Sequence, residues 1–181
     1  MYRSLLLPMC LFPALAFAQE TSPRYSARVV TSITKSEAPA WRTWKGKDLM
    51  MNYPGNWSLD NSGTNGAMVV FLAPVDSTRR FREHVLVHTE QRPGHTMAGL
   101  ADEHAQELRR ANAEGLENQV DGDTQTLTYG IQLNGRPVRC KRTVVKHGDT
   151  VLTLTYVASP DRYEEELFQA DAVLNSLQFL E

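Results

Sequence analysis

The side chains of this sequence best suited to metal binding or acid–base chemistry are its five histidines. Two of them, His84 and His88, are four residues apart in FREHVLVHTE, a segment that alternates like a β-strand. A strand rises about 3.3 Å per residue, so these imidazoles lie roughly 13 Å apart. A zinc ion holds its imidazole ligands at about 2 Å. This pair therefore cannot chelate one metal by itself.

The other three histidines come from separate parts of the chain. His95 follows a Pro-Gly pair, His104 lies on the apolar stripe of a predicted helix, and His147 is at a turn. A histidine on such a stripe fits a partly buried structural role. If folding brings the three together, they form a small-molecule or metal-binding site that could support hydrolysis, and this periplasmic function is the alternative interpretation.

Other signatures of enzyme chemistry are absent from the sequence, which has no G-x-S-x-G, no Gly-rich phosphate loop and no CxxC pair. Asp121 and Asp123 in VDGDT resemble a fragment of a calcium loop, but the remaining ligands and the closing Glu are missing. A plain turn is the better interpretation of VDGDT. Missing motifs prove little, because catalytic groups can assemble from residues far apart in the sequence. Our expectation is nevertheless a protein that is not an enzyme, with no cofactor and no metal site.

The two cysteines do not predict a disulfide. Cys10 lies in the N-terminal apolar run and Cys140 stands alone, whereas exported proteins that depend on disulfides carry even sets of cysteines. Free cysteine behaves mainly as a small hydrophobic residue. We expect a buried or half-buried structural role for Cys140, with a reactive thiol as the alternative.

The N-terminus has the features of a cleavable signal peptide. Arg3 precedes the apolar run LLLPMCLFPALAFA, and Ala16 and Ala18 fit the A-x-A pattern. The run is too short for a retained membrane span, which takes about 20 apolar residues. Residues 1–18 are the predicted signal peptide, cut after Ala18, and the mature chain is expected to be periplasmic or secreted. A lipid anchor on Cys10 is the rival interpretation, although LPM lacks the small residues usual before a lipidated cysteine.

Removing this leader from the 181 residues leaves 163, which is enough for one domain. Residues 19–40 are rich in Ser, Thr, Pro and Ala and predict a flexible lead-in. The composition changes at Trp41, so residues 41–181 are a predicted single domain. Without Arg3, 18 basic side chains face 21 acidic ones, a formal charge of about −3. This balance gives no general attraction to nucleic acid or to anionic membranes.

The first half of the domain has the pattern of strands. WRTWKGKDLMMNYP predicts a hairpin with its turn at residues 45–47. GAMVVFLAP, residues 66–74, is apolar on both faces, as in the middle strand of a sheet covered on both sides. In the strand expected at 81–90, the apolar residues face one way and the polar ones the other, the apolar set being Phe81, Val85 and Val87.

Two amphipathic helices are predicted. The first, residues 96–112, has Thr96 as its N-cap and one apolar stripe made of Met97, Leu100, Ala101, His104, Ala105 and Leu108. The last helix begins with Ser159 as N-cap and Pro160 at its first position. Its stripe consists of Tyr163, Leu167, Ala170, Leu174 and Leu177. Its first turns carry Glu164, Glu165 and Glu166, which the helix dipole favours there as a solvated acidic face rather than a metal site.

Three strands between these helices complete the pattern. Residues 126–133, 136–147 and 150–159 predict an antiparallel meander, with Asn134-Gly135 as a strong hairpin signal. The order of strands, helix, strands and helix is that of an α+β domain whose helices cover an antiparallel sheet.

The segment MNYPGNW closes a strand with Tyr53, Pro54 and Trp57. Proline ends strand pairing because it has no N–H to donate, and a tryptophan at such a bend buries a large area. These residues form either a structural corner of the core or the rim of a ligand site, and the corner is the interpretation we adopt.

Basic side chains gather in two places. Arg79, Arg80 and Arg82 cluster in the loop that enters the 81–90 strand. A second group lies within the 136–147 strand and consists of Arg136, Arg139, Lys141 and Arg142. Because the last helix is acidic, a partner of complementary charge could use this polarity. Solvated strand surface is the plainer interpretation.

These segments together resemble the PsbP/DcrB-like superfamily. The matching stretches are LMMNYPGNW, GAMVVFLAP, EHVLVHTE, a helix, a meander with an Asn-Gly turn, and the closing LNSLQF, over about residues 41 to 180. The resemblance implies an α/β/α sandwich around an antiparallel sheet, with the Tyr-Pro-x-x-Trp rings packed on that sheet. It also implies an accessory or binding role, because no catalytic constellation is shared among such proteins.

The expected function is therefore that of an exported, non-enzymatic accessory or binding protein of the bacterial cell envelope. It would act through protein–protein contacts at a sheet edge or at the basic loop of Arg79, Arg80 and Arg82. The partner is an unidentified envelope protein, and the oligomeric state does not follow from the sequence.

Overall fold

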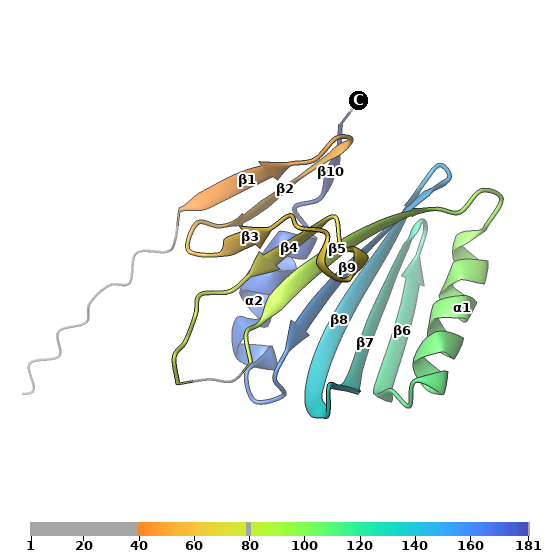
Figure 1. Ribbon diagram of the computed structural model, residues 1–181. Coiled ribbons are helices and arrows are strands. Elements are labelled where there is room, and N and C mark those ends of the chain that lie inside the picture. The colour runs from red at the N-terminus through yellow and green to blue at the C-terminus, as the bar shows by residue number, and fades with distance from the viewer. Residues whose placement is uncertain (1–39, 79–80, 181) are drawn as a thin grey trace, which may run out of the picture. The chain divides into compact units, whose positions relative to one another are not determined.

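The computed structural model describes residues 40–78 and 81–180 (Figure 1). All of them belong to one compact unit, Glu37–Glu181. The predicted signal peptide 1–18 and the lead-in up to residue 39 lie outside the described residues. So do Arg79 and Arg80.

The main element is a seven-stranded antiparallel sheet with the order β3-β4-β5-β9-β8-β7-β6. Its strands are β3 (Ser58–Asp60), β4 (Val69–Leu72), β5 (His84–Gln91), β6 (Glu114–Asp121), β7 (Thr124–Leu133), β8 (Arg136–His147) and β9 (Thr150–Ala158). A short 3-10 helix, Thr64–Gly66, precedes β4. The central strand of this sheet is β9.

A second sheet of three strands has the order β1-β2-β10. The hairpin predicted in WRTWKGKDLMMNYP is confirmed as β1 (Trp41–Lys45) and β2 (Leu49–Pro54). The last strand, β10 (Gln178–Phe179), pairs with β2 and was not predicted, because two residues carry no periodic signal. The start and the end of the described chain therefore meet in this small sheet.

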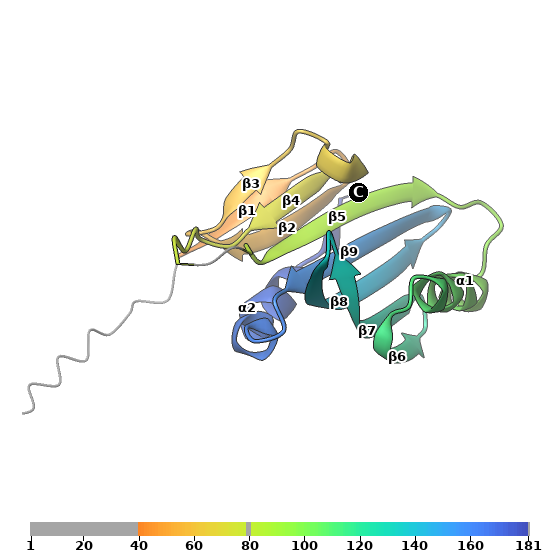
Figure 2. The same ribbon diagram turned by 60° about the horizontal axis from the view of Figure 1, so that its bottom comes forward.

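Two helices cover the large sheet, α1 (Met97–Arg110) and α2 (Tyr163–Leu174). The two helices lie on opposite faces of the sheet, as the alternate side chains of β9 show. Leu152 and Leu154 belong to the larger core cluster under α2, whereas Val151 packs with residues of α1. Figure 2 shows α1 next to β6 and β7 and separated from α2. The predicted α+β fold, an antiparallel sheet with helices on both faces, is confirmed.

The strand predicted at 66–74 is dry on both faces, with Val69 0% and Val70 6% exposed. Its predicted central position is wrong, because β4 lies between the edge strand β3 and β5. The burial of β4 has another cause. Met51 of the small sheet packs in the same core cluster as Val69 and Phe71, so a second sheet covers this flank of the large one.

The predicted three-stranded meander has a fourth strand, β6, which sequence analysis missed. Only Leu116 of its eight residues is half-buried, and the other seven are exposed. No alternation of apolar and polar residues therefore marks this strand. The turn expected at Asp121 and Asp123 is present as the β6–β7 hairpin, with Gly122 at a φ of 56°. β6 is one of the two edges of the large sheet.

Helix α1 agrees with its predicted stripe in all six buried positions, and the Thr96 hydroxyl caps it by accepting from the Gly99 N–H at 3.1 Å. The start of the last helix is corrected, because α2 begins at Tyr163. The Ser159 carbonyl accepts from the backbone N–H groups of Arg162 and Tyr163 at 3.0 Å, so residues 159 to 162 form a turn and the Ser159 hydroxyl does not cap the helix.

The predicted facing of the strand at 81–90 holds for Val85 and Val87, which are fully buried in the larger core. It is wrong for Phe81. This ring precedes β5 and, like Leu86, packs against a second core cluster, which contains Leu108 and Tyr129 on the other face of the sheet.

Candidate binding site

A groove lies between α1 and β5, over β8 and β9. Its apolar part is a hollow of about 240 Å³. The apolar and aromatic side chains that line this hollow include Leu86, Leu108, Tyr129, Ile131, Val138 and Val157. Leu133, which is 42% exposed, stands on its rim. We call this the α1 groove.

The α1 groove continues into a polar hollow of about 350 Å³. Glu107 and Arg142 line both hollows, so they stand where the two meet. His88, Glu90, His104 and Thr153 line the polar part. The groove thus changes from apolar to polar along its length.

Arg142 is a fixed cation at this junction. Its side chain is 17% exposed, and Nη1 lies 3.6 Å from Oε2 of Glu107. The guanidinium carbon is 5.6 Å from the centre of the Tyr129 ring, a cation–π distance. Burial raises the pKa of the Tyr129 phenol well above its usual range, so the ring is neutral at physiological pH and offers its face to the cation.

His104 has a preset tautomer. The Gln125 amide donates through Nε2 to the Ala101 carbonyl at 3.2 Å and to Asn118 Oδ1 at 2.9 Å. Gln125 Oε1 must then accept, and it accepts from Nδ1 of His104 at 2.9 Å. The proton of the neutral imidazole is therefore on Nδ1, and Nε2 is left as an acceptor. His104 is 9% exposed, and its hydrogen bond to Gln125 agrees with the structural role expected for it.

The structure does not gather the three histidines of the alternative hypothesis. His104 lies on the α1 face, whereas His147 stacks on Phe179 at 4.2 Å on the other face. His95 Nε2 is 3.7 Å from Glu103 on the exposed flank of α1. Within residues 40–78 and 81–180, no group of three or more His, Cys, Asp or Glu side chains is placed to hold a metal ion.

His84 and His88 lie on β5, as the sequence indicated, and each contacts a backbone carbonyl. His84 Nδ1 is 2.8 Å from the oxygen of Arg82, and His88 Nε2 is 3.2 Å from that of Asn65. Burial lowers the pKa of His84, so its neutral form is favoured in the folded chain.

Of the predicted partner-binding arginines, only Arg82 is in the described part of the chain. Its guanidinium donates to the Ala73 carbonyl and to the Ser58 hydroxyl, the latter at 2.7 Å. These bonds tie the segment before β5 to β3 and to the end of β4. Arg82 thus has structural partners of its own.

The Tyr-Pro-x-x-Trp segment lies inside the molecule. Tyr53 is 7% exposed and its ring centre is 5.3 Å from that of Phe71. Trp57 is 3% exposed, and its backbone N–H donates to the Pro54 carbonyl at 2.9 Å. Both rings belong to the larger core cluster, so neither offers a free face to a ligand.

The basic side chains of β8 are paired with acidic residues of both helices. Arg139 Nη1 lies 3.0 Å from Glu164 of α2, and Arg142 pairs with Glu107 of α1. In the same way, Arg162 forms ion pairs with Glu165 and Glu166. The three glutamates at the start of the last helix thus form ion pairs with arginines. The sequence had predicted only that they form an acidic face exposed to water.

Cys140 lies on the floor of the α1 groove and is 3% exposed. Burial raises the pKa of its thiol to about 11. A thiol of that pKa is protonated at neutral pH and is a poor nucleophile. The expected structural role is the one that this environment favours.

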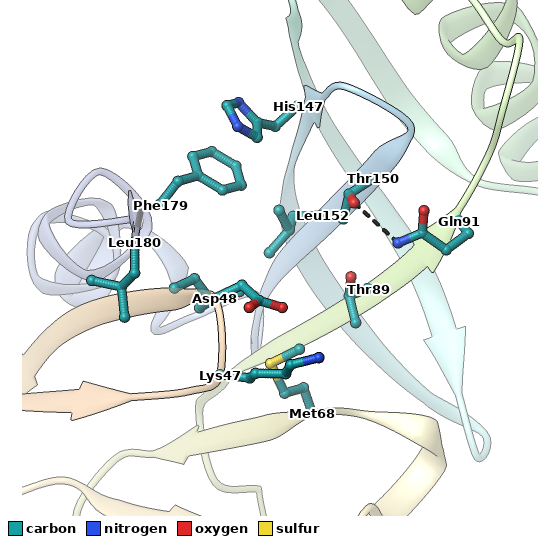
Figure 3. A pocket seen from close by; sticks show the side chains of 11 residues that line it. Lys47, Asp48, Met68, Thr89, Gln91, His147, Thr150, Leu152, Phe179 and Leu180 are labelled. Atoms are coloured by element: carbon teal, nitrogen blue, oxygen red, sulfur yellow. Dashed lines mark hydrogen bonds between the residues drawn. The ribbon is translucent and has the colours of Figure 1, made fainter.

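A second cleft lies where the small sheet meets the large one (Figure 3). Its residues come from the β1–β2 turn, β5, β8, β9 and the C-terminal segment. Neither this cleft nor the α1 groove was predicted, because each is built from four or more segments far apart in the sequence.

None of the described helices combines the length and the apolar character that crossing a membrane requires.

No protein-family model matches the chain, and no curated protein sequence matches it either. Solved structures do. Cyanobacterial PsbP (CyanoP) from Synechocystis sp. PCC 6803 superposes with a TM-score of 0.55 at 19% identity, over 83% of this chain and 98% of its own. LpqN of Mycobacterium tuberculosis, described as involved in cell envelope biogenesis, gives a TM-score of 0.56 at 14% identity, over 78% and 92%.

A protein from Bacteroides thetaiotaomicron VPI-5482 is also similar, with a TM-score of 0.50 and 13% identity. The match covers 80% of this chain and 49% of that one. At these identities the similarity establishes the architecture alone. The chain has the PsbP-like fold, as the sequence motifs predicted.

Proposed function

We propose that this chain is an exported, non-enzymatic accessory protein of the bacterial cell envelope, and that it binds a protein partner in the α1 groove. The observation that carries the proposal is the apolar hollow that ends at the half-buried Arg142. Tight protein contacts concentrate in a desolvated pocket that receives an anchoring side chain.

The chemistry of the α1 groove indicates the kind of segment that fits. The apolar hollow receives an aliphatic or aromatic side chain, and Leu133 on its rim covers that side chain from water. The guanidinium of Arg142 suits a carboxylate, because Arg binds carboxylates through two parallel N–H groups. The partner segment therefore carries an apolar anchor followed closely by Asp or Glu.

Location in the envelope rests on two supports. The N-terminal run with its A-x-A pattern is typical of an export signal. The fold is shared with LpqN, a protein described as involved in cell envelope biogenesis.

The loop of Arg79, Arg80 and Arg82 remains a second contact in this proposal. Because Arg82 holds Ser58 and the Ala73 carbonyl, a test of the loop changes only Arg79 and Arg80. The open edge of β6 is the competing contact, of the strand-addition kind. Its acidic residues protect this edge against indiscriminate pairing, so we place the partner in the α1 groove, and a variant on β6 tests the competing contact.

The test is affinity capture from an envelope extract of the bacterium that produces the chain. We expect Leu133→Glu to reduce the recovered partner at least about tenfold, which corresponds to roughly 1.4 kcal/mol of binding free energy. Val120→Glu is the matched control, because Val120 is 49% exposed on β6, outside the α1 groove.

Failure of the unaltered chain to retain any partner would contradict the proposal. Equal losses in the Leu133 and Val120 variants would contradict it as well. A loss seen only after changing Arg79 and Arg80 to Glu would move the contact to the basic loop and overturn the assignment to the groove.

A further inference from the structure

The cleft between the two sheets has the features of a ligand site of its own. Its volume is about 400 Å³, which is within the range of small-molecule pockets. Figure 3 shows the Asp48 carboxylate, from the β1–β2 turn, directed toward the side of the cleft where Thr89 of β5 lies, with Leu152 between these two residues and the aromatic rings. We call this the inter-sheet cleft. It is distinct from the α1 groove, because it lies on the opposite face of the large sheet.

The floor of the inter-sheet cleft is apolar and its rim is polar. Leu49 is 4% and Leu152 1% exposed, and Met68 is half-buried beside them. The rim side chains are exposed hydrogen-bonding groups, among them Lys47, Asp48, Thr89 and Gln91. A ligand that fills this space therefore has one apolar face and several polar groups at its edge.

Hydrogen-bonding capacity is left over at this rim. Gln91 Nε2 donates to the Thr150 hydroxyl at 3.0 Å, which leaves Gln91 Oε1 as an acceptor and the Thr150 O–H as a donor. Within the described part of the chain, the Asp48 carboxylate has no hydrogen bond or ion pair to a protein group. The rim of the cleft therefore offers a ligand both hydrogen-bond acceptors, on Gln91 and Asp48, and a donor, on Thr150.

Charge narrows the choice of ligand. Among the described residues that line the inter-sheet cleft, Lys47 supplies an ammonium group and Asp48 a carboxylate. These opposite charges leave no net field that would select an anion or a cation. A purely apolar ligand would desolvate Asp48 without giving it a hydrogen bond, which costs free energy. A neutral ligand rich in hydroxyl groups needs no net charge in the cleft and gives Asp48 a hydrogen bond.

An aromatic surface completes the site. The Phe179 and His147 rings stack with centres 4.2 Å apart and planes 19° apart at the mouth of the cleft. Sugar rings combine a C–H face, which packs on such apolar surface, with hydroxyl groups that both donate and accept. We propose that the inter-sheet cleft binds a neutral sugar ring, with its hydroxyls on Asp48, Thr89 and Gln91 and its C–H face toward Phe179 and Leu152.

The test is a ¹H–¹⁵N NMR titration of the protein with two neutral disaccharides, maltose and N,N′-diacetylchitobiose. We expect at least one to bind with a Kd of about 1 mM or tighter and to shift the amide signals around Asp48, Thr89 and Thr150. Asp48→Ala and Thr89→Val should each weaken binding at least about fivefold. Asp102→Ala is the matched control, because Asp102 is exposed on α1.

Both altered positions are exposed, and two variants are used so that misfolding of one leaves the other decisive. Absence of binding by both disaccharides would overturn the inference. Shifts centred elsewhere, or affinities that the two cleft variants leave unchanged, would overturn it too. The result does not depend on the protein partner, because capture through the α1 groove and sugar binding in the inter-sheet cleft are measured separately.

Discussion

Lys141 Nζ lies 2.7 Å from Asp171 Oδ1, across the contact between β8 and α2. The two side chains are 24% and 31% exposed. Arg139 and Arg142 make similar pairs with Glu164 of α2 and Glu107 of α1. The basic strand therefore directs its charges to the helices on both faces of the sheet, where they help to hold the layers together.

A double-mutant cycle measures the strength of this pair. Lys141→Met and Asp171→Asn should show a coupling free energy of about 0.5–1 kcal/mol in urea unfolding, because the pair is only partly shielded from water. The coupling should shrink as salt is added. Asp102→Asn, on the other helix, serves as the control partner for Lys141→Met and should show none. A coupling indistinguishable from this control would contradict the structural role of the pair.

The corner of MNYPGNW is tested by comparing two tryptophans. Trp57 is 3% exposed and Trp41 is 48% exposed. We expect Trp57→Ala to lower the free energy of unfolding by about 3–5 kcal/mol, and Trp41→Ala by no more than about 0.5 kcal/mol. Urea unfolding followed by circular dichroism gives both values, and Trp57→Phe provides a milder variant if the alanine variant does not fold. Equal losses at the two positions would show that Trp57 is not a core residue.

Stability should depend on pH through His84. Burial lowers the pKa of this imidazole from its ordinary value of 6.5. As the pH falls below that value, the unfolded chain takes up the proton before the folded chain does, so the free energy of unfolding decreases. His84→Gln should make the decrease between neutral pH and about pH 5 smaller. Unfolding measured in urea across this range decides the matter, and identical slopes for the two proteins would contradict the prediction.

The strongly periodic parts of the fold could be predicted from the sequence. The six buried positions of α1 follow from its 3.6-residue period. By contrast, β6 could not be predicted, because an exposed edge strand has no buried face to impose alternation. The position of β4 was predicted wrongly for a related reason. Apolar residues on both faces of a strand report that it is covered, but they do not say whether a helix or a second sheet covers it.

The sites were harder to predict than the fold, because their residues meet only in space. The stripe position of His104 was visible, but its partner Gln125 is 21 residues away and carries no sign of the contact. The basic residues of β8 were noted as a group, yet their pairing with Glu107 and Glu164 depends on which faces the helices cover. The hydroxyl and carboxylate groups of the inter-sheet cleft belong to separate strands and turns.

Binding of the partner in the α1 groove is tested most directly by photo-cross-linking in the intact cell. A photoreactive amino acid replaces Leu133 on the rim of the groove or, as the control, Val120 on β6. We predict one dominant cross-linked protein from position 133 that is lost when Arg142 is changed to Met, and none from position 120. Cross-links that are equal at the two positions, or found only at position 120, would contradict binding in the groove.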